Sequence, residues 1–493
     1  MNLPNTARFR RLCGIALVTV LIAPPIISAS ALRTTPESPI PAIEHGLRPA
    51  VVLQGQPVST KTLAAEMARL HVPGVSVAVI HGGGIAWAKG YGVARAGGAA
   101  VDPTTLFQAG SISKPVAAVG ALQLVDDGQL SLDGNINDRL KSWKVPASRY
   151  TGSAGVTLRE LLSHTAGVNV HGFPGYAAGK PVPTLMQVLD GRPPATNDPI
   201  RVVAEPGAKW SYSGGGYTIV QQLIDDVTKQ AFPSWMRTHV LQPAGMARSS
   251  FAQPLPEKGL EDAAMPHDVQ GQPVPGGPHV YPEMAAAGLW STPTDLARFL
   301  IAVQQSVAGK HEGWLRADTA RHMLQPVKPG HSIGFDIGGS GVDAHFSKSG
   351  DTEGFAAFMV AYPARGEGAV VMTNGASGSV LASELMRSIA ATYGWTDFDS
   401  RVRASVPLEA SAFDHFIGTY AFRDQQFVVR AANGHLTIAS PGETPERLYA
   451  ASPQELFVLS QDVGFGFDGA PARPCRSGHL QLGGQQVPFH RVE

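Results

Sequence analysis

The sequence predicts an α+β protein in which an antiparallel sheet flanked by helices carries an inserted, mostly helical lobe and is followed by an all-β barrel domain. Strand-like segments at 72–94 and 345–374 enclose a long stretch of helical patterns. From about residue 405, short apolar and polar alternations recur about every 8–12 residues. The chain has 493 residues, of which 43% are hydrophobic, and this is enough for two ordinary cores.

Residues 1–31 predict a secretory signal peptide. Three arginines precede an apolar run at 12–23, and the small residues at 29–31 suit a signal peptidase. We therefore expect an exported protein, periplasmic or secreted, with no stable membrane span after cleavage. An uncleaved anchor is the alternative, although Pro24–Pro25 ends the run short of the ~20 residues that a span needs. Cleavage leaves Cys475 alone, so no intrachain disulfide is expected.

A first domain is predicted over 50–395. Its first strands form a hairpin at 72–94, where apolar and small residues alternate on either side of Gly82–Gly84. A second group of two or three strands spans 345–374. Helical spacing is found at 111–127, 156–168, 217–232, 291–305 and 380–395. Two Pro- and Gly-rich stretches, 171–197 and 252–279, are long enough to form walls of an active site.

A second domain is predicted over 405–493, because its strand rhythm is typical of a β-sandwich or small barrel. We expect this domain to control access to the site or to support assembly into an oligomer. A passive, stabilising module is the alternative.

The composition excludes several classes of partner. Lys plus Arg and Asp plus Glu number 39 each, and charged residues make up only 16% of the chain, which does not suit a nucleic-acid partner. The zinc motif H-E-x-x-H and the pair C-x-x-C are both missing from the sequence. We expect a small-molecule or short-peptide substrate and neither a metal nor an organic cofactor.

The segment FQAGSISKPVAA, residues 107–118, places Ser111 three residues before Lys114 at the start of a predicted helix. Residues three apart on a helix lie on one face, so the amine can reach the hydroxyl. A lysine removes a serine proton only when burial or nearby positive charge disfavours its charged form. A nucleophilic serine with a lysine base is one interpretation, and a capping serine beside a solvated lysine is the other.

Two further segments favour the catalytic interpretation. Tyr212 and Ser213 precede a glycine run that opens a helix, and Lys348-Ser349-Gly350 lies in a strand context. In this order the three segments resemble the serine penicillin-recognising enzymes, in particular the class C β-lactamase and D-alanyl-D-alanine carboxypeptidase branch with its esterase and D-aminopeptidase relatives. The phrases LLSHTAGV, GLWSTPTDLARF and AYPARGEGAVVMTNG agree with this resemblance. Residues 405–493 resemble the lipocalin-like eight-stranded barrel that some members carry.

The resemblance implies a role for each matching residue. Ser111 would be the acylated nucleophile, Lys114 its proton partner, and Tyr212 the group that relays the proton to the leaving group. Which of these groups holds the proton at rest is left open, and the three are treated as one coupled unit. Lys348 would lower the pKa of Tyr212 and attract a substrate carboxylate. The backbone N–H groups of Ser111 and Asp351 would form the oxyanion hole, and Ser213, Gly214, Ser349, Gly350 and Asp351 would contact the substrate.

One position departs from the pattern. Many relatives have Asn two residues after the tyrosine, and this chain has Gly214, which favours an ester or small amide over a β-lactam or peptide. Lys348 favours a substrate with a carboxylate. The sequence therefore predicts an acyl-enzyme serine hydrolase for small amide, peptide or ester substrates that carry a carboxylate. The alternative is a penicillin-binding-type protein that binds ligands with little or no turnover.

Overall fold

The structure, a computed structural model, describes residues 38–492 except 96, 153, 312, 423–424, 443, 470–472 and 483–484. The predicted signal peptide at 1–31 lies outside the described residues. Along the described part of the chain, none of the helices is both long enough and apolar enough to cross a membrane.

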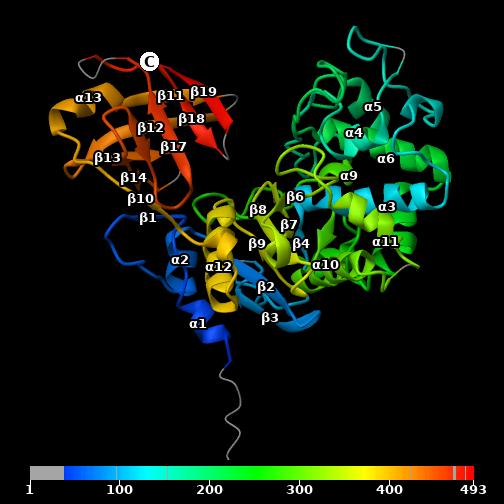
Figure 1. Ribbon diagram of the computed structural model, residues 1–493, viewed down its shortest axis with the longest axis horizontal. Coiled ribbons are helices and arrows are strands. Elements are labelled where there is room, and N and C mark those ends of the chain that lie inside the picture. Colours follow the sequence, from blue (N-terminus) through cyan, green and yellow to red (C-terminus); the bar gives the residue numbers. More distant parts are fainter. Residues whose placement is uncertain are drawn as a thin grey trace, which may run out of the picture. The chain divides into compact units, whose positions relative to one another are not determined.

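A six-stranded antiparallel sheet forms the centre of the first predicted domain, with strand order β3-β2-β9-β8-β7-β6 (Figure 1). The hairpin predicted at 72–94 is confirmed as its first two strands, the group predicted at 345–374 supplies three more, and the edge strand β6 was not predicted. The bounds are β2 (Gly74–His81), β3 (Gly84–Gly92), β6 (Asp336–Gly338), β7 (His345–Thr352), β8 (Phe355–Tyr362) and β9 (Glu367–Thr373). Four short strands form two separate pairs: β1 (Val51–Leu53) pairs with β10 (Arg401–Arg403), and β4 (Phe107–Gln108) pairs with β5 (Trp290–Ser291).

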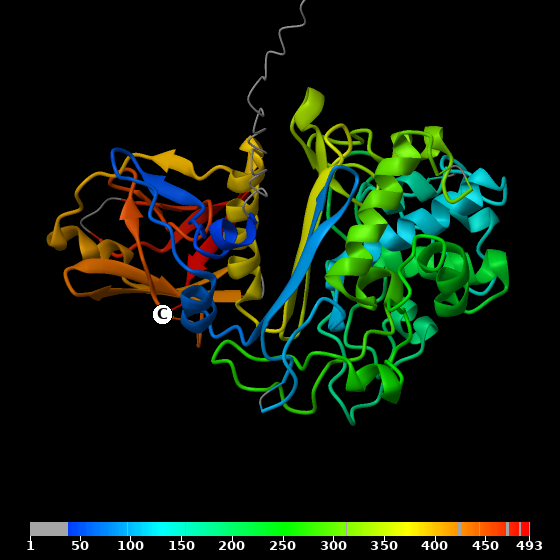
Figure 2. The ribbon, with the colours of Figure 1, turned by 90° about the horizontal axis from the view of Figure 1, so that it is seen from below.

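Helices cover both faces of the sheet (Figure 2). The helix α10 (Pro293–Val307) lies on one face, and its start follows from Thr292, whose hydroxyl accepts a hydrogen bond from Asp295 N, with proline in the first turn. The other face packs against α12 (Gly378–Tyr393), with α1 (Ile40–Glu44) and α2 (Leu63–Arg69) beside it. The strands β2, β8 and β9 are buried on both faces, as expected for a sheet between two helical layers.

The inserted lobe is mostly helical, as predicted. Its elements are α3 (Ser113–Asp126), α4 (Leu158–Leu162), α5 (Leu185–Asp190), α6 (Gly214–Thr228), α7 (Phe232–Met236), α8 (Glu257–Glu261), α9 (Met284–Ala287) and α11 (Ala317–Met323). The helix α4 begins with a capping box between Thr157 and Glu160.

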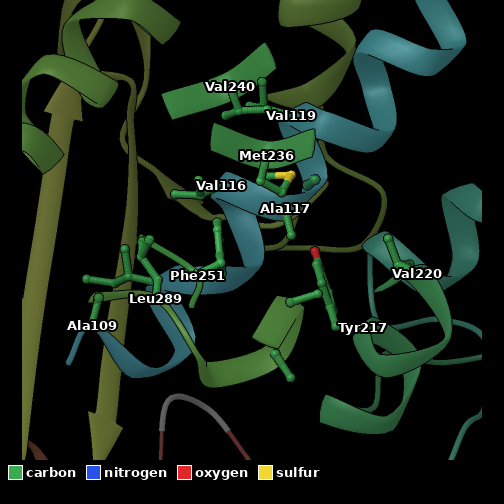
Figure 3. Close-up of a cluster of buried hydrophobic side chains, with 14 of the residues drawn as sticks. Ala109, Val116, Ala117, Val119, Tyr217, Val220, Met236, Val240, Phe251 and Leu289 are labelled. Carbon is green, nitrogen blue, oxygen red and sulfur yellow. The ribbon is translucent and has the colours of Figure 1, made fainter. Parts of the chain in front are cut away.

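The helix α3 lies in the middle of the core of this lobe (Figure 3). Its residues are small or apolar on nearly every side, and Val116, Ala117 and Val119 are fully buried against neighbouring helices. A helix that is apolar all round belongs in an interior. The predicted start at Ser111 is two residues early, because a 3-10 turn at Gly110–Ile112 precedes the helix. The rigid core therefore fixes the position of this turn.

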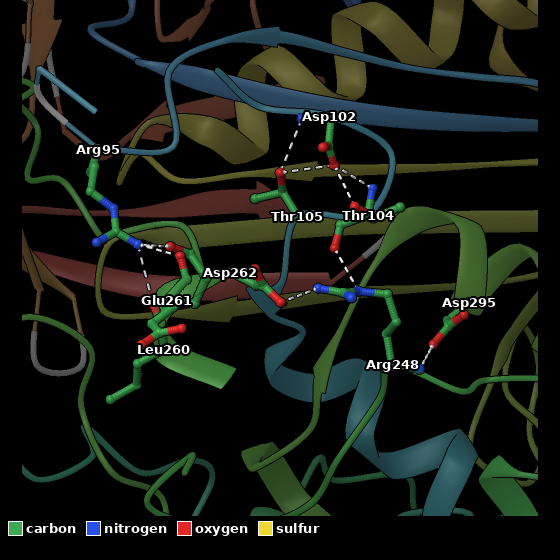
Figure 4. Close-up of polar contacts among 10 residues, drawn as sticks. Arg95, Asp102, Thr104, Thr105, Arg248, Leu260, Glu261, Asp262 and Asp295 are labelled. Carbon is green, nitrogen blue, oxygen red and sulfur yellow. Dashed lines mark hydrogen bonds and ion pairs between the residues drawn. The ribbon is translucent and has the colours of Figure 1, made fainter. Parts of the chain in front are cut away.

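A polar network anchors the predicted wall segment 252–279 at one end (Figure 4). The Arg248 guanidinium donates to Thr104 O at 3.0 Å and to Asp262 Oδ2 at 2.8 Å. The Arg248 backbone N–H donates to Asp295 Oδ2 at 2.9 Å. Arg95 also donates to Glu261 O at 2.8 Å. These bonds connect the segment to α10 and to the chain before β4.

The second predicted domain forms a nearly closed antiparallel barrel of nine strands in the order β14-β13-β12-β11-β19-β18-β17-β16-β15. The expected number of eight strands is therefore corrected to nine. Tyr420, Phe427, Phe467 and Phe489 pack together inside it. The bounds are β11 (Gly418–Phe422), β12 (Gln425–Ala432), β13 (His435–Ala439), β14 (Glu446–Arg447), β15 (Tyr449–Ala450), β16 (Glu455–Phe457), β17 (Val463–Phe467), β18 (Ser477–Leu482) and β19 (Gln485–Arg491), with α13 (Phe413–Phe416) before the first strand.

Glu283, at the start of α9, makes a testable contribution to stability. Its side chain is fully buried, neither carboxylate oxygen has a partner on another described residue, and burial raises its pKa from 4.5 to about 8. Between these values the folded state keeps a proton that the unfolded state has lost, so Glu283 destabilises the fold increasingly as pH rises. We expect Glu283→Gln to raise the free energy of unfolding by roughly 2–4 kcal/mol at pH 8.

The same substitution is expected to change stability little near pH 4.5, where the carboxyl is protonated in the folded state and still half protonated in the unfolded state. Urea unfolding of wild type and Glu283→Gln at pH 4.5 and pH 8 measures the difference. A gain of equal size at both pH values contradicts the assigned cause.

Candidate active site

The Ser111 turn lies against β7, at a point where only glycines fit. Gly110 has φ +50°, and a Cβ on it would lie 2.6 Å from Asp351 N. A Cβ on Gly350 would lie 2.1 Å from Ala109 O and 2.8 Å from Ser111 N. Contacts of this length exclude a side chain, so both glycines allow the two backbones to approach closely. The amide nitrogens of Ser111 and Asp351, predicted as the oxyanion donors, are thus held near each other.

Lys114 lies within hydrogen-bond distance of Ser111. Its Nζ lies 3.0 Å from Ser111 Oγ and donates to Ala286 O at 2.8 Å. The residue is only 2% exposed. Burial, together with the positive charge of Lys348, holds the pKa of Lys114 well below its ordinary 10.5. Both effects disfavour the ammonium relative to the uncharged amine, which has the lone pair that a base needs.

Tyr212 approaches Ser111 from the other side. Its hydroxyl donates to Ser111 Oγ at 2.7 Å. The ring of His164 packs on the tyrosine ring with centroids 4.3 Å apart, and Lys114 Nζ lies 4.8 Å from the centroid of the tyrosine ring. Tyr212 directly precedes α6, so its position depends on the start of that helix.

The expectation that Lys348 lowers the pKa of Tyr212 is wrong. Burial raises the pKa of the Tyr212 hydroxyl well above its ordinary 10, and the carboxylates of Asp336 and Asp351 raise it further. The neutral phenol is therefore the favoured form, and it is a hydrogen-bond donor.

Lys348 lies beside the Tyr212 ring, and its ammonium has a partner. Its Nζ is 5.0 Å from the centroid of the Tyr212 ring and 3.3 Å from Asp336 Oδ2. His331 Nδ1 lies 3.0 Å from Asp336 Oδ1, and the His331 ring stacks on Trp210 at 3.9 Å between centroids. The predicted cation is present, but a carboxylate of the protein already pairs with it.

Ser213 and Ser349 have positions that do not favour the predicted substrate contacts. Ser213 Oγ accepts from Gly216 N at 3.0 Å and donates to Asn169 O at 2.7 Å, so the hydroxyl caps α6. Ser349 is exposed on the face of β7 opposite Lys348, because successive residues of a strand alternate between faces.

Gly214 is enclosed by the predicted wall segment. A Cβ on Gly214 would lie 3.0 Å from the Phe173 ring and 3.2 Å from His171 O. Phe173 therefore occupies the space that a side chain at position 214 would need. An asparagine does not fit here without movement of this segment. The glycine at position 214, which departs from the family pattern, is therefore consistent with the packing of Phe173 against it.

Sequence reasoning missed three contributors to the site: Asp336, His331 and the carbonyl of Ala286. In the structure, His164 Nδ1 accepts a hydrogen bond from Ser213 N at 3.1 Å, and its ring supports Tyr212.

Comparison with known proteins gives a family match over most of the first predicted domain. The model of the family described as Beta-lactamase matches residues 60–393. Protein flp of Staphylococcus aureus strain N315 is 23% identical over 340 residues, which cover 64% of this chain and 62% of that protein. Penicillin-binding protein 4 of Amycolatopsis lactamdurans is 30% identical over 198 residues, or 40% of this chain and 49% of that protein. The chain therefore spans less than two thirds of the length of these relatives.

A solved structure extends the likeness in fold. The octameric penicillin-binding protein homologue from Pyrococcus abyssi matches with a TM-score of 0.60 and 21% sequence identity. The match covers 87% of this chain and 98% of the chain of that homologue. At this identity, the likeness concerns the fold alone.

Proposed function

Because the chain belongs to the Beta-lactamase family, we propose that it is a serine hydrolase that works through an acyl-enzyme on small amide, peptide or ester substrates. One observation carries this proposal: Ser111 Oγ lies 3.0 Å from Lys114 Nζ and 2.7 Å from the Tyr212 hydroxyl. A hydroxyl between a buried amine and a buried phenol has both a base and an acid within hydrogen-bond distance.

The reaction follows from this arrangement. Ser111 Oγ attacks the substrate carbonyl carbon while the Lys114 amine takes the hydroxyl proton. The oxygen that becomes negative is stabilised by the N–H groups of Ser111 and Asp351, each typically worth about 2.7–4 kcal/mol. Tyr212 donates its proton to the leaving group as the bond to carbon breaks, and the proton that Lys114 has taken then replaces it on the phenolate. Water then hydrolyses the acyl-enzyme by the same steps in reverse order.

The packing of Gly214 and Phe173 bears on the substrate. An apolar ring in place of an amide supplies surface without hydrogen bonds to the acyl group. This supports small esters and amides over substrates that need a polar acyl-side contact. The carboxylate predicted from Lys348 is not supported by the pairing of Lys348 with Asp336.

The proposal is tested by a fluorescent fluorophosphonate, which reacts only with an activated serine. We expect one adduct per chain, located on Ser111 by peptide mass spectrometry, together with catalytic hydrolysis of p-nitrophenyl acetate. Heat-denatured protein is the control and is expected to remain unlabelled. An adduct at another serine, or no adduct on folded protein, overturns the proposal.

A ligand-binding protein with little turnover is the second candidate, favoured by the filled space at Gly214. It predicts labelling of Ser111 without release of more than one equivalent of p-nitrophenolate. A burst of one equivalent with no steady-state phase therefore selects it over the hydrolase. Nitrocefin, assayed in parallel, distinguishes a β-lactamase from an esterase or amidase.

The remaining expectations are proposals as well. We propose an exported protein, periplasmic or secreted, and an oligomer in which the C-terminal barrel supports assembly. The octameric assembly of the Pyrococcus abyssi homologue supports the oligomer.

A further inference from the structure

The charge of Lys348 is balanced by a carboxylate that the fold holds in place. Asp336 lies on β6, the edge strand, where it pairs in register with Ser347 next to Lys348. Its Oδ2 lies 3.3 Å from Lys348 Nζ, and the side chain of Lys348 is only 7% exposed. The ion pair is thus formed within the sheet that carries Lys348, on the rim of the Ser111 cleft.

The Asp336 carboxylate is oriented by a second partner. Its Oδ1 lies 3.0 Å from His331 Nδ1, and the His331 ring is stacked on Trp210 at an interplanar angle of 9°. Burial opposes ionisation of Asp336, but His331 and Lys348 outweigh it and lower the pKa of Asp336. The carboxylate is therefore charged at neutral pH, with both oxygens in use.

Several charged groups surround Tyr212. Burial, together with Lys348, Lys114, His331 and His171, holds the pKa of His164 well below 6.5. Burial and Lys348 likewise hold the pKa of Lys114 well below 10.5. Asp351 is exposed at the end of β7, and its carboxylate, like that of Asp336, raises the pKa of Tyr212.

Lys348 lies beside the proposed proton donor to the leaving group. Its Nζ is 5.0 Å from the centroid of the Tyr212 ring. As part of the inference, a substrate group within reach of Lys348 is taken to belong to the leaving group. A carboxylate there would have to compete with Asp336 for the ammonium and would meet the charge of Asp351 as well.

From this geometry, and resting on the hydrolase function proposed above, we infer that the site selects esters and amides whose leaving group carries no carboxylate, with Asp336 as the residue that sets this preference. Asp336 acts through Lys348, so it is a specificity-determining residue rather than a catalytic one. This preference is the opposite of the sequence-based expectation, which treated Lys348 as a free cation that attracts a substrate carboxylate.

A matched pair of esters tests the inference. The acetyl esters 3-acetoxybenzamide and 3-acetoxybenzoate share the acyl group and differ in a neutral or anionic leaving group. For the wild type we expect kcat/KM to be about 5-fold or more higher for 3-acetoxybenzamide than for 3-acetoxybenzoate. We expect this difference to arise from KM. In Asp336→Asn the ammonium is released, and we expect the ratio to shift about tenfold towards the carboxylate, the effect typical of one charge-assisted contact.

The ratio of kcat/KM between the two esters separates the effect of substrate charge from the other effects of Asp336→Asn. Removing the Asp336 charge also changes the pKa of Tyr212, but this alters kcat for both esters alike. Asp343→Asn is the matched control, because Asp343 pairs with Arg365 at 2.8 Å and is expected to leave the ratio unchanged. If Asp336→Asn does not fold, protection of wild-type Ser111 from fluorophosphonate by 3-hydroxybenzamide and 3-hydroxybenzoate gives the same comparison, with stronger protection expected from the amide.

Two results overturn the inference while leaving the hydrolase intact. One is a wild type that prefers the anionic ester or is protected better by the anionic phenol. The other is a folded Asp336→Asn variant whose ratio stays within twofold of the wild type. If neither ester is hydrolysed and Ser111 is not labelled, the hydrolase proposal itself fails, and the inference fails with it.

Discussion

Lys114→Met is expected to lower kcat/KM for p-nitrophenyl acetate by about 10²–10⁴-fold, the contribution usual for a positioned general base. Methionine has nearly the length and volume of lysine, so it fills the same buried space. It removes the only amine within 3.0 Å of Ser111 Oγ among the described residues. Without this base the serine keeps its proton when it attacks, and the reaction slows.

Steady-state kinetics of purified Lys114→Met measure this effect, with Ser111→Ala as the reference for background hydrolysis. The wild-type rate is expected to rise with pH through the depressed pKa of Lys114, and this limb is expected to disappear in Lys114→Met. A folded Lys114→Met variant within fivefold of the wild type contradicts the role of Lys114 as the base.

Lys114→Met is expected to be more stable than the wild type, although it is expected to be less active. The folded pKa of Lys114 lies well below 10.5, so below pH 10.5 the unfolded state binds a proton that the folded state releases. Stability therefore rises with pH from the folded pKa towards 10.5, and the buried lysine destabilises the fold at neutral pH. We expect the variant to unfold at higher urea concentration at pH 7, with Ala286 O left without this donor as the opposing cost.

The sheet and the barrel could be predicted because their patterns are local. In the first hairpin, Gly82 and Gly83 have φ of +62° and +77°, which makes the turn visible in the sequence. The number of barrel strands could not be predicted, because β14 and β15 have two residues each and a pattern of period two needs more. The start of α3 was misplaced because a 3-10 turn and an α-helix share the same apolar spacing over three residues.

The chemistry of the site was predictable where it depends on side chains at fixed spacings. Ser111 and Lys114 are close in sequence, and Tyr212 and Lys348 belong to recognisable segments. Asp336 was not predictable, because its pairing with Lys348 depends on the register between β6 and β7. The Ala286 carbonyl that holds Lys114 is a backbone group, which every residue has, so the sequence contains no sign of it.

Tyr212→Phe is expected to slow substrates with poor leaving groups much more than substrates with good ones. The phenol is the group within 2.7 Å of Ser111 Oγ that holds a proton at rest, since burial raises its pKa well above 10. An alkoxide or amine leaves slowly unless it is protonated, whereas p-nitrophenolate leaves readily without a proton. Loss of the donor should therefore cost about 10²–10⁴-fold for an alkyl ester or an amide, and about tenfold or less for p-nitrophenyl acetate, because little proton transfer is needed there.

The comparison uses ethyl acetate and p-nitrophenyl acetate, which form the same acetyl-enzyme and differ only in the group that leaves. Deacylation is therefore common to both, and a difference in kcat/KM reports the acylation step. His164 packs against the tyrosine ring, and phenylalanine preserves this contact, so the variant is expected to fold as the wild type does. An equal loss for both esters would instead assign Tyr212 to activation of Ser111, and the acid would then have to be the ammonium that Lys114 becomes after it takes the serine proton.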